Sequence, residues 1–344
     1  YYARVAQWLN PPPPAAPGTL TPSFPEYGLS PAAGMFAARV LRAPIWLLLS
    51  ALLARLLRPD GLGAWAMILS AAMLANQVFF LWTQSITQRF GRSEWLETRQ
   101  LDQTWSLRWP LLAGAMLVIV VVLVGPSDWQ GPMYGLSELQ RWLIVPVLVA
   151  LWWMGEAQGL QQVRARFGVM AWSPLVADAV LVVVVSLLLA AAATGRPLLG
   201  PDGNLGAVAM TGTAVWAAIL ARELRGMRLR WRLPSGEAQR RALVFAAPLV
   251  PGYAVGYLAE WCDYWLIGYF YDAHAVGIFH VAYQYMLVLV GMPAAAAVVL
   301  LPQAVAAIDR AGESSLHEFA DRNGRILCAR QDLRRRIARR RPPP

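Results

Sequence analysis

The chain of 344 residues has little of what soluble catalytic domains use: it contains no lysine, two cysteines and three histidines, and only 15% of its residues are charged. All thirty basic residues are arginines, so the chain has no Gly-x-x-x-x-Gly-Lys phosphate loop, and an ATP-driven motor is excluded. Cys262 and Cys328 lie on different predicted elements and form no disulfide framework. The histidines give no metal-ligand pattern, and we expect neither a metal nor a cofactor.

What the chain does contain is apolar sequence. Apolar residues make up 57% of it and the mean hydropathy is +0.43, values outside the usual range of soluble proteins. Long apolar runs recur along the chain, and each, with its flanks, reaches the roughly 20 residues that cross a ~30 Å hydrocarbon layer. The sequence predicts an all-α polytopic membrane protein with about eight transmembrane helices. The predicted spans are 34–57, 64–88, 107–126, 139–161, 168–194, 204–223, 241–270 and 275–303.

The links between these spans alternate between arginine-rich and arginine-poor. Arginines gather around 89–106, in 162–167, in 224–240 and in the C-terminal tail. Because cytoplasmic loops carry the arginine excess, these links are predicted to face the cytoplasm, together with both termini. The net charge of +10 then reflects topology and contact with membrane lipid headgroups, and we expect no nucleic-acid partner. The first of these links, with its flank, includes Arg89, Arg92, Arg99 and Arg108.

Ionisable side chains inside a span are costly, so each is a candidate functional residue. Arg39 and Arg42 share a helix face near the inner end of the first span, where they either present a cationic pair to a central cavity or extend to the inner headgroups. Asp178 lies roughly 15 Å into the fifth span and is either a proton or cation site or a packing carboxyl. Glu260 and Asp263 give the seventh span an acidic face, with an interfacial position as the alternative.

Uncharged polar residues form a second group of candidates. Gln77 and Gln84 in the second span can supply hydrogen bonds across a polar lumen. His280 and Gln284, with Tyr283, share one face of the eighth span at helical spacing, an arrangement that suits sugar contacts. Packing between helices is the alternative for the whole group.

Two stretches of the sequence carry motifs of a known family. The segment Leu52–Ala72 reads LLARLLRPDGLGAWAMILSAA and resembles the first hairpin of bacterial polysaccharide flippases. The second stretch resembles the seventh and eighth spans of that family in order and spacing. It comprises Ala247–Pro248, Asp263–Phe270, Ala275–Phe279 and Leu301–Pro302. Over about 34–312 the chain therefore resembles the oligosaccharide flippase branch of the multidrug, oligosaccharidyl-lipid and polysaccharide exporter superfamily.

The resemblance implies two six-helix lobes around a central cavity. This chain would hold the N-terminal lobe at 34–232 and the first two helices of a second lobe at 233–312. A short internal echo, in which Leu62–Trp65 aligns with Val276–Phe279, is expected if both lobes arose from one repeated unit.

The two ends differ in composition from the spans. Residues 1–33 are proline-rich and 313–344 are basic, and we expect both segments to be disordered or out of frame. The chain opens on Tyr1 rather than on methionine, and the membrane pattern stops after the eighth span. These features lead us to expect a fragment of a longer transporter.

The function implied by the resemblance is that of a flippase, not of an enzyme. Such a protein moves a polyprenyl-diphosphate-linked oligosaccharide across the bacterial inner membrane for O-antigen, capsule or exopolysaccharide assembly. Arg39 and Arg42 would bind the diphosphate, because fixed positive charge replaces hydration lost in the bilayer. Asp178, with Glu260 or Asp263, would couple transport to H⁺ or Na⁺.

Other functions stay open at this point. A multidrug or cation exporter, or a lipid II flippase, would share the architecture, although drug exporters usually need acidic cavities whereas the first span here brings arginines. A polytopic glycosyltransferase or polysaccharide polymerase usually needs an outer loop with catalytic acids. The longest predicted outer link, 127–138, carries only Asp128 and Glu138. A non-functional remnant is a further alternative.

Overall fold

The computed structural model describes residues 29–124, 136–194, 198–225, 227 and 236–287. Every regular element within these ranges is a helix. Most of the N-terminal segment 1–33 and the whole basic tail, both expected to be disordered, lie outside these ranges, but residues 29–33 already form the start of a helix, so the expectation is wrong for them. Most of the link 127–138 and Arg228, Arg230 and Arg232 also lie outside the described ranges. The elements are α2 (Leu29–Ala75), η1 (Asn76–Leu81), α3 (Trp82–Ile86), η2 (Thr87–Gly91), α4 (Arg92–Thr98), α5 (Asp102–Val124), α6 (Glu138–Trp142), α7 (Ile144–Val163), α8 (Phe167–Ala193), α9 (Pro201–Leu224), α10 (Gly236–Ala246) and α11 (Leu249–Phe270), followed by a helical stretch at 273–287.

Six helical segments within the described ranges are long and apolar enough to cross a membrane. The chain is thus a multi-pass membrane protein, as the hydropathy pattern predicts. The first segment, Ala37–Gly91, has 55 residues and covers the predicted span 64–88 and all but the first three residues of the predicted span 34–57. The eighth predicted span, 275–303, is described only as far as residue 287. The total of about eight spans and the division into lobes therefore remain predictions.

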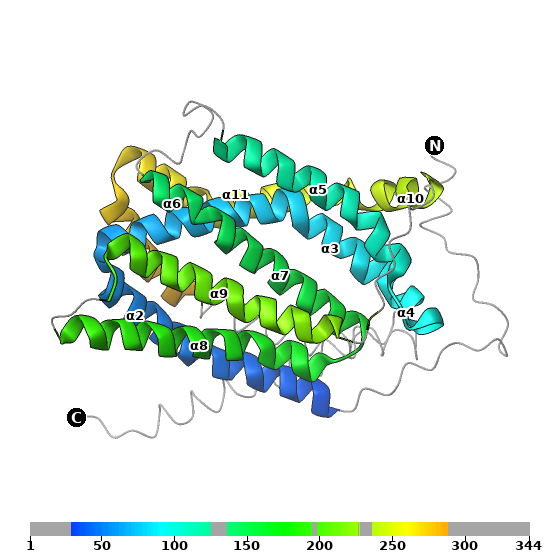
Figure 1. The fold of residues 1–344 in the computed structure, drawn as a ribbon, viewed down its shortest axis with the longest axis horizontal. Coiled ribbons are helices and arrows are strands. Elements are labelled where there is room, and N and C mark those ends of the chain that lie inside the picture. The colour runs from blue at the N-terminus through cyan, green and yellow to red at the C-terminus, as the bar shows by residue number, and fades with distance from the viewer. Residues whose placement is uncertain (1–28, 125–135, 195–197, 226, 228–235, 288–344) are drawn as a thin grey trace, which may run out of the picture.

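The long first segment turns back on itself at Arg58. The backbone there has φ 59° and ψ 172°, outside the helical region, and Pro59 follows directly. Proline lacks an amide hydrogen and disfavours helical geometry in the residue before it, so the break is encoded locally. We call residues 29–57 the first arm and 59–91 the second arm. Figure 1 shows the two arms, in dark and light blue, diverging from this turn.

The two arms occupy different places in the bundle. The first arm lies along α8, and α7 packs against α9 (Figure 1). The second arm contacts α5, α7 and α11 through its η1, α3 and η2 segments, and its Ala66, Ile68, Ala72 and Phe80 are completely buried. This arm therefore lies at the centre of the hydrophobic core, between α5 and α7 and the later helix α11.

The turn between the arms packs reciprocally against the turn before the last helical stretch. A Cβ atom at Gly63 would overlap the carbonyl oxygen of Ala273, and one at Gly277 would overlap that of Pro59. Asp60 Oδ1 and His274 Nδ1 lie 3.2 Å apart and are separated by 214 positions, the same separation that relates Gly63 to Gly277. Equivalent residues thus face one another, and the two segments of the sequence echo are in contact.

Helix α5 begins earlier than its hydropathy predicts. Its first turn contains Asp102, and the carboxylate of Glu94 in α4 accepts hydrogen bonds from the amides of Gln103 (2.7 Å) and Thr104 (2.9 Å) and from the Thr104 hydroxyl (2.6 Å). A negative charge on the free amides of a helix N-terminus satisfies them and opposes the helix dipole. The predicted link 89–106 is consequently mostly helical, and Arg108 lies within α5.

Candidate functional site

Arg42 and Asp178 form an ion pair between the first arm and α8. Arg42 Nε lies 2.5 Å from Asp178 Oδ2, and Nη2 lies 3.5 Å from Oδ1. The Asp178 side chain is only 7% exposed, whereas that of Arg42 is 38% exposed. Asp178 lies roughly 16 Å from the start of α8 at 1.5 Å per residue, well inside the apolar span. The carboxylate is therefore buried and neutralised, while part of the cation remains accessible.

A string of hydrogen bonds extends from this pair into the last helices. The Arg42 guanidinium lies 5.5 Å from the centre of the Trp46 ring, within cation–π range. Trp46 Nε1 donates to Gln284 Oε1 at 2.5 Å, Gln284 Nε2 lies 3.1 Å from His280 Nε2, and His280 Nδ1 lies 3.1 Å from the Tyr264 hydroxyl. Four of the predicted site residues, from three separate spans, are thus connected: Arg42, Asp178, His280 and Gln284.

The other predicted site residues lie apart from this string. Arg39 is exposed one helical turn before Arg42. Gln84 is buried beside Gly155 of α7, where a Cβ atom would overlap its amide, and Gln77 lies near Gly256 of α11. The two remaining candidates, Glu260 and Asp263, are exposed on α11, and no contact among the described residues joins either to Asp178.

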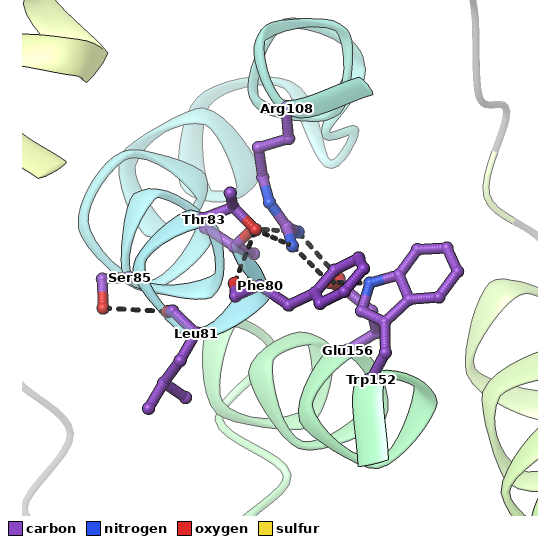
Figure 2. A network of polar contacts seen from close by, with 8 residues as sticks. Phe80, Leu81, Thr83, Ser85, Arg108, Trp152 and Glu156 are labelled. Atoms are coloured by element: carbon purple, nitrogen blue, oxygen red, sulfur yellow. Dashed lines mark hydrogen bonds and ion pairs between the residues drawn. The ribbon is translucent and has the colours of Figure 1, made fainter. Parts of the chain in front are cut away.

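A second buried ion pair, Arg108 with Glu156, lies inside the bundle (Figure 2). The two guanidinium Nη atoms of Arg108 each donate to one carboxylate oxygen of Glu156, with Nη1 at 2.7 Å from Oε2. The same nitrogens donate to Thr87 Oγ1 at 2.6 Å and to Thr83 Oγ1 at 3.2 Å, and Trp152 Nε1 donates to Glu156 at 3.0 Å. This network joins the second arm, α5 and α7.

The position of Arg108 corrects the interpretation of the first cytoplasmic link. Its side chain is 1% exposed and faces the inside of the bundle, where it is paired with Glu156 rather than exposed at a helix end. Arg108 and Glu156 lie about 9 and 10 Å from the start of α5 and the end of α7, which is the same depth in two antiparallel helices. Opposite charges at matching depth in two neighbouring spans are the kind of signal that could have paired these residues. Hydropathy missed it because it placed the span start at residue 107.

The ends of α7 and α9 meet in a third polar cluster. Glu223 is 1% exposed and lies 3.4 Å from both Arg164 Nη1 and Arg166 Nη1, and Gln161 Nε2 donates to Ser173 Oγ at 3.0 Å. Burial lowers the pKa of Arg164, and the nearby charge of Arg166 lowers it further, while Glu223 opposes both effects. These two arginines of the link 162–167 are therefore tied to the bundle. Their two positive charges offset the cost of burying the carboxylate of Glu223.

Clusters of three or more potential metal ligands do not occur among the residues that the structure describes. The polar groups instead form ion pairs and hydrogen-bond strings between helices. Such groups are rare inside membrane spans and usually mark transport pathways or fix helix packing.

Helical membrane architecture with ionic pairs between spans defines the class of a polytopic membrane protein with an internal polar site. Comparison with known families is more specific: the polysaccharide biosynthesis protein family matches residues 33–306, and the chain belongs to that family. This match confirms the family resemblance carried by the motifs. Comparisons with curated proteins and with solved structures give no match.

Proposed function

We propose that the protein is a flippase that moves a polyprenyl-diphosphate-linked oligosaccharide from the inner to the outer leaflet of a bacterial inner membrane. Membership of the polysaccharide biosynthesis family supports a role in making surface polysaccharide. The observation that carries the proposal is the partly accessible guanidinium of Arg42, held inside a membrane span by a buried carboxylate. In this proposal the protein is a transporter rather than an enzyme, and both termini are cytoplasmic.

The Arg42 and Asp178 pair provides a mechanism for substrate binding. A guanidinium binds phosphate oxygens bidentately, and a diphosphate carries more negative charge than one carboxylate. The diphosphate therefore competes with Asp178 for Arg42. Once displaced, the buried carboxylate of Asp178 lacks its counterion, and an unpaired charge at that depth is costly. It then takes up H⁺ or Na⁺, so that substrate loading and cation uptake occur together.

The remaining candidate residues have supporting roles in this proposal. Arg39, exposed one turn away, adds a second positive charge to the approach toward Arg42. Gln84, which lies against α7, and Gln77, which lies near α11, serve as hydrogen-bond partners for the oligosaccharide in conformations that open the second arm from these two helices. Glu260 and Asp263, exposed within the apolar span of α11, would take part in cation coupling.

Complementation of a flippase-deficient strain tests the role of Arg42. In the full-length protein, Arg42→Ala should abolish surface polysaccharide at unchanged protein level, because the diphosphate loses its cationic partner. Arg89→Ala, which removes an exposed arginine from the end of the second arm, is the charge-matched control and should have little effect. Normal polysaccharide with Arg42→Ala would rule out the proposed diphosphate site.

Substitution of Asp178 separates binding from coupling. Asp178→Asn keeps an acceptor for Arg42 but carries no charge and takes no proton. Binding of a polyprenyl diphosphate to the purified protein should therefore tighten, while transport in liposomes should lose its dependence on an imposed cation gradient. Gradient-dependent transport that persists in Asp178→Asn would make Asp178 a packing residue.

One observation favours a second candidate function, export of cations or cationic drugs. Glu260 and Asp263 are exposed carboxylates inside a membrane span, and such groups attract cationic substrates. Drug sensitivity of cells that carry Glu260→Gln and Asp263→Asn distinguishes the two functions. Increased sensitivity with normal polysaccharide would favour export, whereas loss of polysaccharide alone would favour the flippase.

A further inference from the structure

The hydrogen-bond string behind Arg42 has one direction. The indole nitrogen of Trp46 only donates, so the atom of Gln284 that it contacts at 2.5 Å is the amide oxygen. The amide nitrogen of Gln284 must then donate to His280 Nε2 at 3.1 Å, which means that Nε2 carries no hydrogen. In the neutral imidazole, the hydrogen therefore lies on Nδ1, which donates to the Tyr264 hydroxyl at 3.1 Å. Each donor and acceptor is fixed by the one before it.

No single side chain of this string can exchange its donor and acceptor roles without losing a hydrogen bond. Turning over the Gln284 amide would place its NH₂ group against the indole N–H of Trp46, two donors facing each other. Tyr264 is completely buried, and Gln284 and His280 are 3% and 5% exposed, so no bulk solvent replaces a lost partner. The orientation of the Trp46 ring is consequently set by residues of α11 and of the last helical stretch.

The Trp46 ring in turn supports Arg42. The guanidinium contacts both this ring, at 5.5 Å from its centre, and the carboxylate of Asp178. When a diphosphate displaces Asp178, the ring remains as a contact that aims the guanidinium. The direction in which Arg42 presents its guanidinium to the diphosphate therefore depends on the orientation of the Trp46 ring, and through it on Gln284 and His280.

The same bonds engage every polar atom of Gln284 and His280, and both side chains are buried away from a ligand. Both polar atoms of the Gln284 amide and both ring nitrogens of His280 are engaged within the string. The second N–H of the Gln284 amide and the second lone pair of its oxygen are buried with the residue, which is 3% exposed, so a sugar contact would need the surrounding helices to part.

We propose that Gln284 and His280 are positioning residues, which act on the substrate diphosphate through Trp46 and Arg42 and do not contact the oligosaccharide. This inference rests on the proposed function, and it replaces the sugar-binding role expected for these two side chains. It assigns a part of the diphosphate site to the helices at the C-terminal end of the described chain.

Binding of a sugar-free polyprenyl diphosphate to the purified full-length protein in nanodiscs tests the proposal. Gln284→Leu, His280→Leu and Trp46→Phe should each weaken binding about tenfold, the effect of one lost buried hydrogen bond, and should weaken binding of the oligosaccharide-linked form by the same factor. His280→Gln keeps an acceptor for Gln284 and a donor for Tyr264, and should restore most of the affinity.

A control variant and a double variant distinguish the proposal from its alternatives. Tyr283→Phe removes a hydroxyl from the same helical stretch, one that donates to the Glu260 carbonyl rather than to the string, and should leave affinity unchanged. Trp46→Phe combined with Gln284→Leu should lose no more than either change alone. Weaker binding of only the oligosaccharide-linked form would show sugar contacts and overturn the inference. Normal binding by Arg42→Ala would instead overturn the proposed diphosphate site itself.

Discussion

Removing the charge of Glu156 while Arg108 is retained should strongly destabilise the folded protein. The Arg108 side chain is 1% exposed, and its guanidinium makes four hydrogen bonds, two of them to Glu156. Glu156→Gln preserves size and one acceptor, but it places an NH₂ group opposite a guanidinium donor and leaves a buried positive charge without a counterion. Loss of one partner of a buried ion pair costs about 3–5 kcal/mol.

Removing both charges together should be much less harmful. In Arg108→Met combined with Glu156→Gln, the glutamine oxygen still accepts from Trp152 Nε1, and the glutamine nitrogen has Thr83 or Thr87 Oγ1 as an acceptor. No buried charge remains, and a hydrophobic side chain of similar length fills the space of the arginine. Replacement of a buried pair in this way is often neutral or even stabilising, so we expect the double variant to lie within about 1–2 kcal/mol of the wild type.

The assay is reversible unfolding in mixed detergent micelles, with the two single variants, the double variant and the wild type forming one cycle. The expected coupling energy is at least about 4 kcal/mol, because each single change should cost about 3–5 kcal/mol by leaving the other charge unpaired, whereas the double change should cost no more than about 2 kcal/mol. Glu237→Gln is a suitable control, since its ion pair with Arg241 is exposed and should contribute little. Additive losses in the double variant would refute the reasoning, as would a Glu156→Gln variant of wild-type stability.

Four further substitutions test other parts of the fold. Gly63→Ala or Gly277→Ala should each destabilise the protein by about 1–3 kcal/mol, the usual cost of overpacking, since the added methyl meets a backbone carbonyl; equal melting temperatures would show that the two turns do not pack as described. Glu94→Ala should cost about 1–2 kcal/mol by leaving the first amides of α5 without a cap, and amide exchange at Gln103 that stays slow would contradict this. Tyr257→Phe should cost about 1–3 kcal/mol, because the Trp265 indole N–H loses its acceptor; chemical denaturation that is unchanged would place that bond outside the stable core.

Helix positions followed from the sequence because a membrane span needs only length and apolar character. The predicted span 139–161 agrees with α6 and α7 taken together, and the spans 168–194 and 204–223 agree with α8 and α9, each to within about three residues. The boundary of α5 differed by five residues, because Glu94 caps the helix from another element and allows polar residues to form its first turn. A contact of that kind depends on tertiary structure, which a local pattern does not contain.

The candidate site was only partly predictable for the same reason. Arg42 and Asp178 stand out singly as charges within spans, but their pairing requires the first arm to lie along α8, and no local signal specifies that neighbour. Arg108 was assigned to a link, although its buried environment is provided by threonines on the second arm and by an acid on α7. Residue chemistry thus identified the charges, and only the fold showed which of them are partners.

The reciprocal packing of the two turns has a consequence for assembly. A surface whose residues meet their own counterparts is the kind that joins two identical subunits about a twofold axis, and it is saturated once two copies are in place. Here both copies belong to one polypeptide, so the contact between the two turns is already made within the chain. A tandem duplication would convert such a homodimer into a single protein without any new contact having to evolve.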